Sequence, residues 1–245
     1  HMSLEGTDLD KLALSTEKLL AGTDSKITTV GYYCNPIQYA EHRKTLENVI
    51  CTAGKFGATH VSTFAGAWEG KPVESAYEEF GKVFRELADL AEEKGVKLGI
   101  ENCLMDGTWE HATCNIGFNP KAWEVMFEEV KNDNFGLEWE PTHQMVQLID
   151  PVTELRKWCK KIVHIHGKDA TIDWDAVRHS GISGAVPFVW HRMPGFGDTN
   201  WRDIISILRS NGYEDDICIE GYHDPVYSGE LEMTGQLHAL NYLKW

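Results

Sequence analysis

Basic residues are few in this chain: 23 lysines and arginines face 38 aspartates and glutamates, so the formal net charge is −15 at pH 7. Nucleic-acid binding depends mainly on Lys and Arg side chains that neutralise phosphates, and a surface this acidic repels a phosphate backbone. We therefore expect no nucleic acid among the partners.

Paired cysteines, long apolar runs and a signal-like N-terminus are also lacking. The six cysteines form no CxxC pair. No apolar run approaches the roughly 20 residues that a bilayer-spanning helix needs. We expect a cytoplasmic protein with reduced thiols and no membrane partner. A Gly-rich, basic phosphate cradle is absent too, which argues against a phosphorylated small molecule as the substrate.

Short β-branched runs alternate with longer amphipathic stretches along the 245 residues, which is typical of βαβ units with a parallel sheet. The predicted strands are residues 27–33, 59–64, 96–101, 135–139, 162–166 and 217–220. The predicted helices are residues 8–20, 39–56, 73–94, 120–131, 151–160 and 201–211. A weak run at 186–192 is interpreted as part of a loop. No linker divides the chain, so we predict one α/β domain over residues 1–245.

Polar side chains cluster just after four of the predicted strands. In parallel α/β proteins this edge of the sheet is where sites are built. Three carboxylates and one imidazole from four strands suit a divalent metal, and the lack of a thiolate cluster argues against a structural zinc. The candidate ligands are Glu101, Glu140, His166 and Glu220.

Each of these positions also has a purely structural interpretation. A single glutamate at a strand end is more often solvated or salt-bridged than a metal ligand. His164 and His166 point to the same face of their strand because only one residue separates them. One of them is enough for a metal, and His164 then packs or forms hydrogen bonds inside the protein.

Five segments in a fixed order resemble the xylose isomerase-like TIM-barrel superfamily of sugar isomerases and epimerases. They are "IENC", "LEWEPTHQ", "VHIHGKDA", "HRMPGFGDTNW" and "DDICIEGYHDP", and the run Asn115–Trp123 is similar to this group as well. The resemblance covers residues 27–245. It implies a TIM-type (β/α) barrel and the same four metal ligands.

The resemblance also assigns roles around the metal. By this resemblance, His143 binds a substrate hydroxyl group or lies in the shell of residues around the metal ligands. Arg192 contacts substrate oxygens. Position 140 is Glu where the family usually has Asp, so the ion is expected to shift by about an ångström or to change its ligation; Glu138 is a weaker alternative for this ligand. The expected ion is Mn²⁺, with Mg²⁺, Co²⁺ and Zn²⁺ as alternatives.

Two loops add candidate substrate contacts. Lys168 follows His166 into a loop, where it either contacts the substrate or forms a structural salt bridge. Asp169 beside it either orients neighbouring residues or forms a structural salt bridge. Trp109 lies in a long loop after the Glu101 strand, and long loops in compact domains are often functional. Trp68, Trp139 and Trp190 could also wall the pocket, although most tryptophans are expected to pack in the core.

These residues suit proton transfer next to a carbonyl. A chelated ion stabilises the enediolate, while Glu101 and Glu220 remove and return a proton. Return to the same carbon makes an epimerase, and return to the adjacent carbon makes an isomerase. A dehydratase or lyase, an inactive sugar-binding relative and an apurinic-site endonuclease remain as alternatives, the last disfavoured by charge and by few histidines.

By the resemblance, the strand at 27–33 corresponds to the third of the family. The first strand is then missing, and "SLEG" at residues 3–6 is the end of the second. Six strands leave exposed sheet edges, which proteins normally cover. We expect the helix at 8–20, a preceding segment or another subunit to cover them, so a homo-oligomer is a candidate assembly.

Overall fold

The structure is a computed structural model that describes residue 4 and residues 6–244. It divides into two compact units. The first comprises the chain up to Trp139 together with Lys161–His164, and the second comprises Glu140–Lys160 and the chain from Ile165 onward. Of the residues proposed as the end of a second strand, Ser3 and Glu5 lie outside the described part. A single domain over the whole chain stays a prediction.

The first unit carries the start of a parallel sheet. Its strands are β1 (Thr29–Gly31), β2 (His60–Thr63), β3 (Lys97–Glu101), β4 (Phe135–Trp139) and the first half of β5 (Ile162–Gly167). β1 pairs with β2, β2 with β3 and β3 with β4, all in parallel. The parallel α/β expectation is therefore confirmed for these strands.

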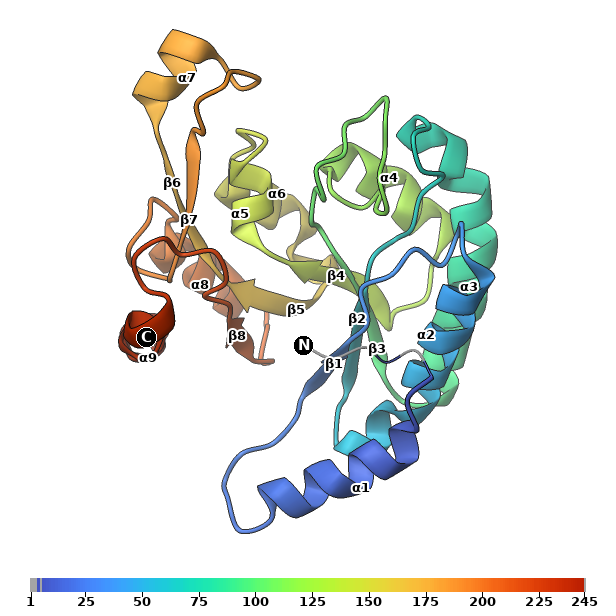
Figure 1. The fold of residues 1–245 in the computed structure, drawn as a ribbon. Coiled ribbons are helices and arrows are strands. Elements are labelled where there is room, and N and C mark those ends of the chain that lie inside the picture. The colour runs from blue at the N-terminus through green and yellow to red at the C-terminus, as the bar shows by residue number, and fades with distance from the viewer. Residues whose placement is uncertain (1–3, 5, 245) are drawn as a thin grey trace. The chain divides into compact units, whose positions relative to one another are not determined.

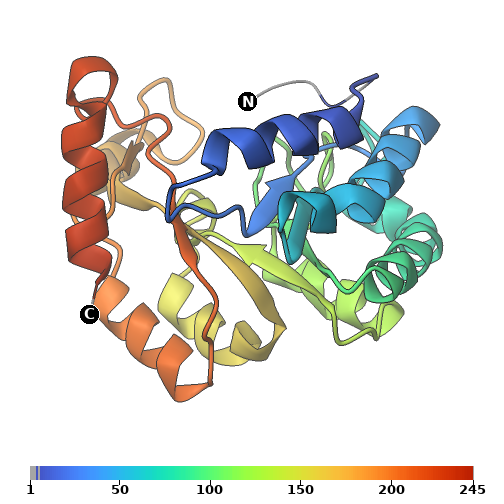
Figure 2. The same ribbon diagram turned by 90° about the horizontal axis from the view of Figure 1, so that it is seen from below.

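Helices cover the first unit's strands on one face. They are α1 (Leu9–Leu20), α2 (Ala40–Thr52), α3 (Tyr77–Glu93) and α4 (Pro120–Glu129), with short 3₁₀ turns at Ala53–Phe56 and Val73–Ala76. α2 and α3 lie side by side (Figure 1), and α1 lies next to α2 (Figure 2). Rings of Phe80, Phe84 and Phe135 pack together between helix and strand, with centroids 4.6–6.2 Å apart. This aromatic cluster fixes α3 on β4.

The second unit contains the rest of β5 and β8 (Ile217–Ile219), which pair in parallel. A separate antiparallel pair, β6 (Asp169–Ile172) and β7 (Val189–Arg192), follows β5. The helices of this unit are α5 (Pro141–Met145), α6 (Pro151–Trp158), α7 (Trp174–Ser180), α8 (Trp201–Ser210) and α9 (Glu232–Leu243), with 3₁₀ turns at Cys159–Lys161, which bridges the two units, and at Gly229–Leu231. Trp201, Ile204 and Leu208 bury one side of α8.

The sequence interpretation was wrong at residues 186–192, which were treated as loop. Residues 189–192 form β7, and α5, α7 and α9 were not predicted either. The predicted helix boundaries hold where a glycine stops the helix. Gly95 and Gly212, for example, follow α3 and α8 with φ of +70° and +79°, a conformation that favours glycine. Within residues 4 and 6–244, no helix is long and apolar enough to cross a membrane.

Candidate metal centre

Three of the four predicted metal ligands lie together in the second unit. Glu140 directly follows β4, His166 is on β5, and Glu220 directly follows β8. Nδ1 of His166 is 3.2 Å from Oε2 of Glu220 and 3.6 Å from Oε2 of Glu140. One ligand atom from each of these residues lies within 4.8 Å of the others. The ends of two parallel strands and the residue after β4 thus supply one cluster.

Lys168 and His143 complete this cluster. Nζ of Lys168 donates to Oε1 of Glu220 at 3.0 Å and lies 3.8 Å from Oε1 of Glu140. Nε2 of His143, on α5, lies 3.2 Å from the same Glu140 oxygen. Lys168 is only 3% exposed, so a buried ammonium here is paired with carboxylates. It therefore forms the salt bridge that was one of its two predicted roles.

The neighbouring nitrogen groups keep Glu140 ionised although it is completely buried. Burial by itself raises the pKa of Glu140, but His143, Lys168 and His166 oppose it, and the pKa lies well below the usual value. His143 shifts in the direction of its neutral form. Its pKa is lowered mainly by burial, while Glu140 acts the other way. A neutral imidazole beside an ionised carboxylate is a suitable partner for a substrate hydroxyl.

Glu101, the fourth predicted ligand, ends β3 in the first unit and is 7% exposed. A buried asparagine fixes the backbone at this point. Nδ2 of Asn115 donates to the carbonyl oxygens of Glu101 at 2.9 Å and Cys103 at 2.8 Å. Its Oδ1 accepts from the backbone N–H groups of Ala65 and Gly117. Asn115 therefore ties the end of the Glu101 strand to the segments of Ala65 and Gly117 through four hydrogen bonds.

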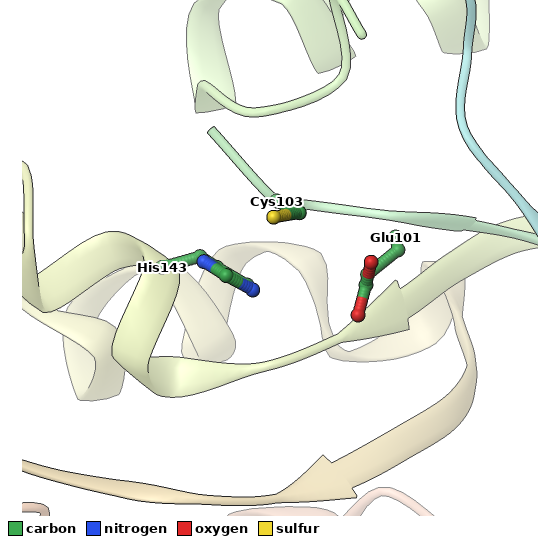
Figure 3. A group of neighbouring side chains, drawn as sticks. All are labelled: Glu101, Cys103 and His143. Carbon is green, nitrogen blue, oxygen red and sulfur yellow. The ribbon is translucent and has the colours of Figure 1, made fainter. Parts of the chain in front are cut away.

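Figure 3 shows three donor side chains and the elements that carry them. Glu101 lies at the end of β3, Cys103 lies in the segment that follows it, and His143 lies on the short helix α5. Cys103 was treated only as one of the scattered thiols. Its position two residues after a predicted ligand was the available signal that it is a further potential donor beside Glu101.

Glu138 and His164 form a separate buried pair in the first unit. The hydroxyl of Tyr33 donates to Oε2 of Glu138 at 2.9 Å, and Nε2 of His164 is 3.8 Å from Oε1 of Glu138. Thr29 Oγ1 lies 3.4 Å from the His164 ring nitrogens. The supporting role of His164 and the choice of Glu140 over Glu138 as the ligand stay predictions.

Three further predicted residues have well-defined partners. Nε of Arg192 donates to Asp224 at 3.3 Å, and the guanidinium lies 5.9 Å from the centroid of the Phe196 ring. The indole N–H of Trp109 donates to Glu74. Asp169 accepts backbone N–H groups of the segment 195–199, as its orienting role predicted. Contacts of Arg192 and Trp109 with substrate stay predictions. Trp139 is 1% exposed and belongs to the core.

Two residues near the cluster escaped the sequence interpretation. His191 is on β7, and the charges of Lys168 and Glu140 act on it. Asp224, in the loop after β8, is 3% exposed and accepts from the backbone N–H groups of Met193, Val226 and Tyr227. The segment "DDICIEGYHDP" contains the predicted ligand Glu220, but nothing in it indicates that Asp224 holds β7.

Comparison with known proteins gives relatives of several activities. An inosose dehydratase of Clostridium tetani is 26% identical over 170 residues, which are 67% of this chain and 54% of that protein. The chain thus spans about half the length of this relative. The 3-keto-D-glucoside 4-epimerase of E. coli has a similar structure, with a TM-score of 0.71, 13% identity and coverage of 98% of this chain and 87% of the epimerase.

A third similar structure is that of the IOLI protein with a binding zinc atom. Its TM-score is 0.67 and its identity 20%, and the match covers 98% of this chain and 80% of that one. At such identities these structures show the shared fold. The family model described as xylose isomerase-like TIM barrel matches residues 6–244. The TIM-barrel fold class is thereby confirmed, and the chain belongs to the xylose isomerase-like TIM-barrel family.

Proposed function

We propose that this chain is a metal-dependent enzyme that removes a proton next to the carbonyl group of a sugar or a keto-polyol. The observation that carries the proposal is the cluster of Glu140, His166 and Glu220, with its donor atoms 3.2 and 3.6 Å apart. Two atoms that ligate one ion at about 2.0–2.2 Å lie about 3.3–3.6 Å apart at a tetrahedral angle. The donor set therefore fits a divalent ion.

Glu101 is the fourth ligand in this proposal. It is the last residue of β3, and the other two carboxylates likewise lie at the carboxyl ends of their strands. A bound divalent ion would stabilise negative charge on the substrate oxygens. The protein's own residues then move the proton: Glu101 or Glu220 removes it from the carbon, and the other glutamate acts as the acid. His143 and Lys168 hold substrate hydroxyl groups.

Two outcomes follow from the same first step. If the enediolate takes a proton back, the product is an epimer or the aldose–ketose isomer. If it instead expels the hydroxyl group of the next carbon, which leaves with a proton as water, the reaction is a dehydration. The name of the Clostridium tetani relative favours dehydration of a keto-inositol, and the epimerase of similar structure favours proton return.

Incubation in deuterated water separates these reactions. The protein is loaded with Mn²⁺ or Zn²⁺ and given inosose or a panel of ketoses, with EDTA-treated protein as a control. Deuterium at the α carbon of recovered substrate or of its epimer indicates proton return, and loss of water detected by mass spectrometry indicates dehydration. If the metal-loaded protein causes neither with any carbonyl compound, the proposed function is wrong.

A pair of variants tests the role of the glutamates. Glu101→Gln and Glu220→Gln should each lower deuterium exchange by about 10²-fold or more, because general acid–base groups contribute about 10²- to 10⁴-fold. Glu230→Gln, in the 3₁₀ turn before α9, is the matched control and should exchange normally. An unchanged rate of deuterium exchange in Glu220→Gln would show that Glu220 does not transfer the proton.

A further inference from the structure

The hairpin of β6 and β7 brings a histidine back toward the cluster. β6 begins one residue after Lys168, and β7 pairs with it in antiparallel fashion, with His191 opposite Ala170. Side chains alternate between the faces of a strand, so Lys168, Ala170 and His191 share a face if the alternation extends back to Lys168. The charges of Lys168 and Glu140 act on the His191 ring, which agrees with this placement.

The neighbour of His191 points the other way. Arg192 donates to Asp224 and stacks over Phe196, so its guanidinium is held away from the face that His191 uses. Asp224 also accepts the N–H group of Met193 at 2.7 Å. This double attachment to Arg192 and Met193 fixes the end of β7 and with it the direction of the His191 side chain.

The His191 imidazole lacks the partners of a structural histidine. Among the residues that the structure describes, its Nδ1 is shielded from solvent and has no hydrogen-bond partner, while the ring as a whole is only partly buried. Buried polar atoms in proteins are normally paired, so the Nδ1 atom of His191 is available to a partner from outside the protein. Burial and then Lys168 lower the pKa of His191 to about 4, so the ring is neutral near pH 7.

A second imidazole faces the first. The ring of His223 has its centroid 5.8 Å from that of His191, with the ring planes at 55°. His223 has a φ of +73°, an unusual conformation for a residue other than glycine. Such backbone strain persists where the surrounding structure enforces it, and it concentrates at functional sites. The two rings form one polar corner next to the metal-ligand cluster.

We propose that His191 binds a hydroxyl group of the substrate at this corner. A neutral imidazole carries one donor and one acceptor nitrogen, which match a hydroxyl group. An anionic group such as phosphate is a poor match, because Lys168 is already paired with Glu220 and Glu140. The inference rests on the proposed function for its ligand class, a sugar or polyol, and it adds a residue that selects substrates by a hydroxyl group remote from the carbonyl.

Three variants test this role with inosose as the probe. His191→Phe keeps a ring and removes both nitrogens, so KM should rise about 10-fold or more while kcat changes less. His191→Asn keeps a hydrogen-bonding group and should stay closer to the wild type. His179→Phe, exposed on α7 in the same hairpin, is the matched control. Affinity for Mn²⁺, measured by calorimetry, should be equal in all four proteins.

A binding measurement separates this inference from the reaction. myo-Inositol, which has no carbonyl group, is titrated into the wild type while the imidazole C–H resonances are followed by NMR. The His191 resonance, assigned by its loss in His191→Asn, should shift. If it shifts although no carbonyl compound reacts, the inference stands and the proposed reaction is wrong. If inosose reacts, but His191→Phe has a normal KM and the resonance does not move, the inference is overturned.

Discussion

Glu140 shows how a single buried carboxylate depends on its neighbours. It is fully buried, and its oxygens lie 3.2–3.8 Å from donor nitrogens of His143, His166 and Lys168. Removing one partner from a buried charge is costly because the remaining charge is left uncompensated. The side chains of this cluster therefore support one another, and the same groups that would hold a metal also neutralise the carboxylates without it.

His166→Ala should abolish tight metal binding. The imidazole is the only nitrogen ligand in the proposed set, and without it the remaining ligands are carboxylates whose charge Lys168 partly neutralises. Isothermal titration calorimetry with Mn²⁺ and Zn²⁺ should show an affinity lowered by about 100-fold or more. Loss of a residue that only supports a ligand already lowers metal affinity by about 10- to 100-fold. His179→Ala serves as the control. Equal affinity in His166→Ala would exclude this histidine as a ligand.

Asn115→Leu should destabilise the first unit. It removes the acceptor for two buried N–H groups and the donors to the carbonyl oxygens of Glu101 and Cys103. Each buried group left without a partner costs about 1–3 kcal/mol, so we expect the free energy of unfolding to fall by about 2–4 kcal/mol. Urea unfolding measures this, with the exposed Asn48→Ala as control. A loss below that of the control would contradict the role.

At the residue scale, the polar residues at the ends of the strands could be predicted from the sequence. Glu140, His166 and Glu220 follow or end apolar strands, and parallel strands direct their carboxyl ends to one edge. Their meeting in one cluster was therefore predictable. His191 was not, because its position depends on the register of an antiparallel hairpin whose strands are separated by residues 173–188. Sequence alone gives no register across a connection of that length.

Two aspartates anchor the elements that extend from β5. Asp169 starts β6 and accepts N–H groups of Ala170, Gly195, Gly197 and Thr199. Asp224 ties the loop after β8 to the end of β7. Carboxylates that accept several backbone N–H groups act as fixed points for irregular segments. The hairpin and its neighbouring loops are thus held by two buried charges.

Asp169→Asn should loosen the segment 195–199. An amide offers one acceptor oxygen instead of two, so about two of the four N–H groups lose their partner, and unfolding should be easier by about 2–4 kcal/mol. Hydrogen exchange of the Gly195, Gly197 and Thr199 amides should accelerate at the same time. The exposed Asp175→Asn should change neither quantity. Unchanged exchange in Asp169→Asn would show that other contacts hold this segment.

Asp224 should make stability depend on acid pH. Burial raises its pKa, but N–H groups of Tyr227, Met193 and Val226 and the charge of Arg192 outweigh this, so the folded pKa is lowered. A lowered folded pKa adds stability above the unfolded value of about 3.9, and this stability is lost as pH falls through the folded pKa. The stability difference between wild type and Asp224→Asn should therefore be largest near pH 6 and shrink below about pH 4. A constant difference would contradict this.

At the element scale, the strands of the parallel sheet were predictable because they are apolar runs between turn signals. The missed elements carry weaker patterns. α5 has five residues, α7 buries none of its side chains, and α9 exposes Met233, Leu237 and Leu240. β6 and β7 hold mixed polar residues, since they pair with each other outside the main sheet. Hydrophobic periodicity identifies elements that are long enough to show a repeat and that bury an apolar face in a core, and each of these lacks one of the two.

For the whole molecule, the alternation of strands and helices was enough to predict the α/β class, and the ordered segments added the barrel family. The division into two compact units was not predictable, because no linker or change in composition marks it. Homo-oligomerisation and a cytoplasmic location stay predictions. The order β1-β2-β3-β4-β5-β8 leaves β1 and β8 at the ends of the described sheet.

Metal binding should raise the stability of the folded chain. A ligand present at about 100 times its Kd adds about 2.7 kcal/mol, which corresponds to a rise in Tm of about 5–10 °C for a protein of this size. Calorimetry with Mn²⁺, Zn²⁺ or EDTA measures the shift, and His166→Ala should show none. A wild-type Tm that does not respond to any of the proposed ions would contradict the metal site.

The hairpin that carries His191 has a consequence for how relatives diversify. The pairs from Asp169 with Arg192 to Ile172 with Val189 set the alignment of its two strands, whereas residues 173–188 join them. Insertions or deletions in that connection leave the base undisturbed, while an exchange at position 191 alters which ligands are accepted. Natural or engineered substitutions in this hairpin can therefore change ligand specificity while the metal ligands at the strand ends stay unchanged.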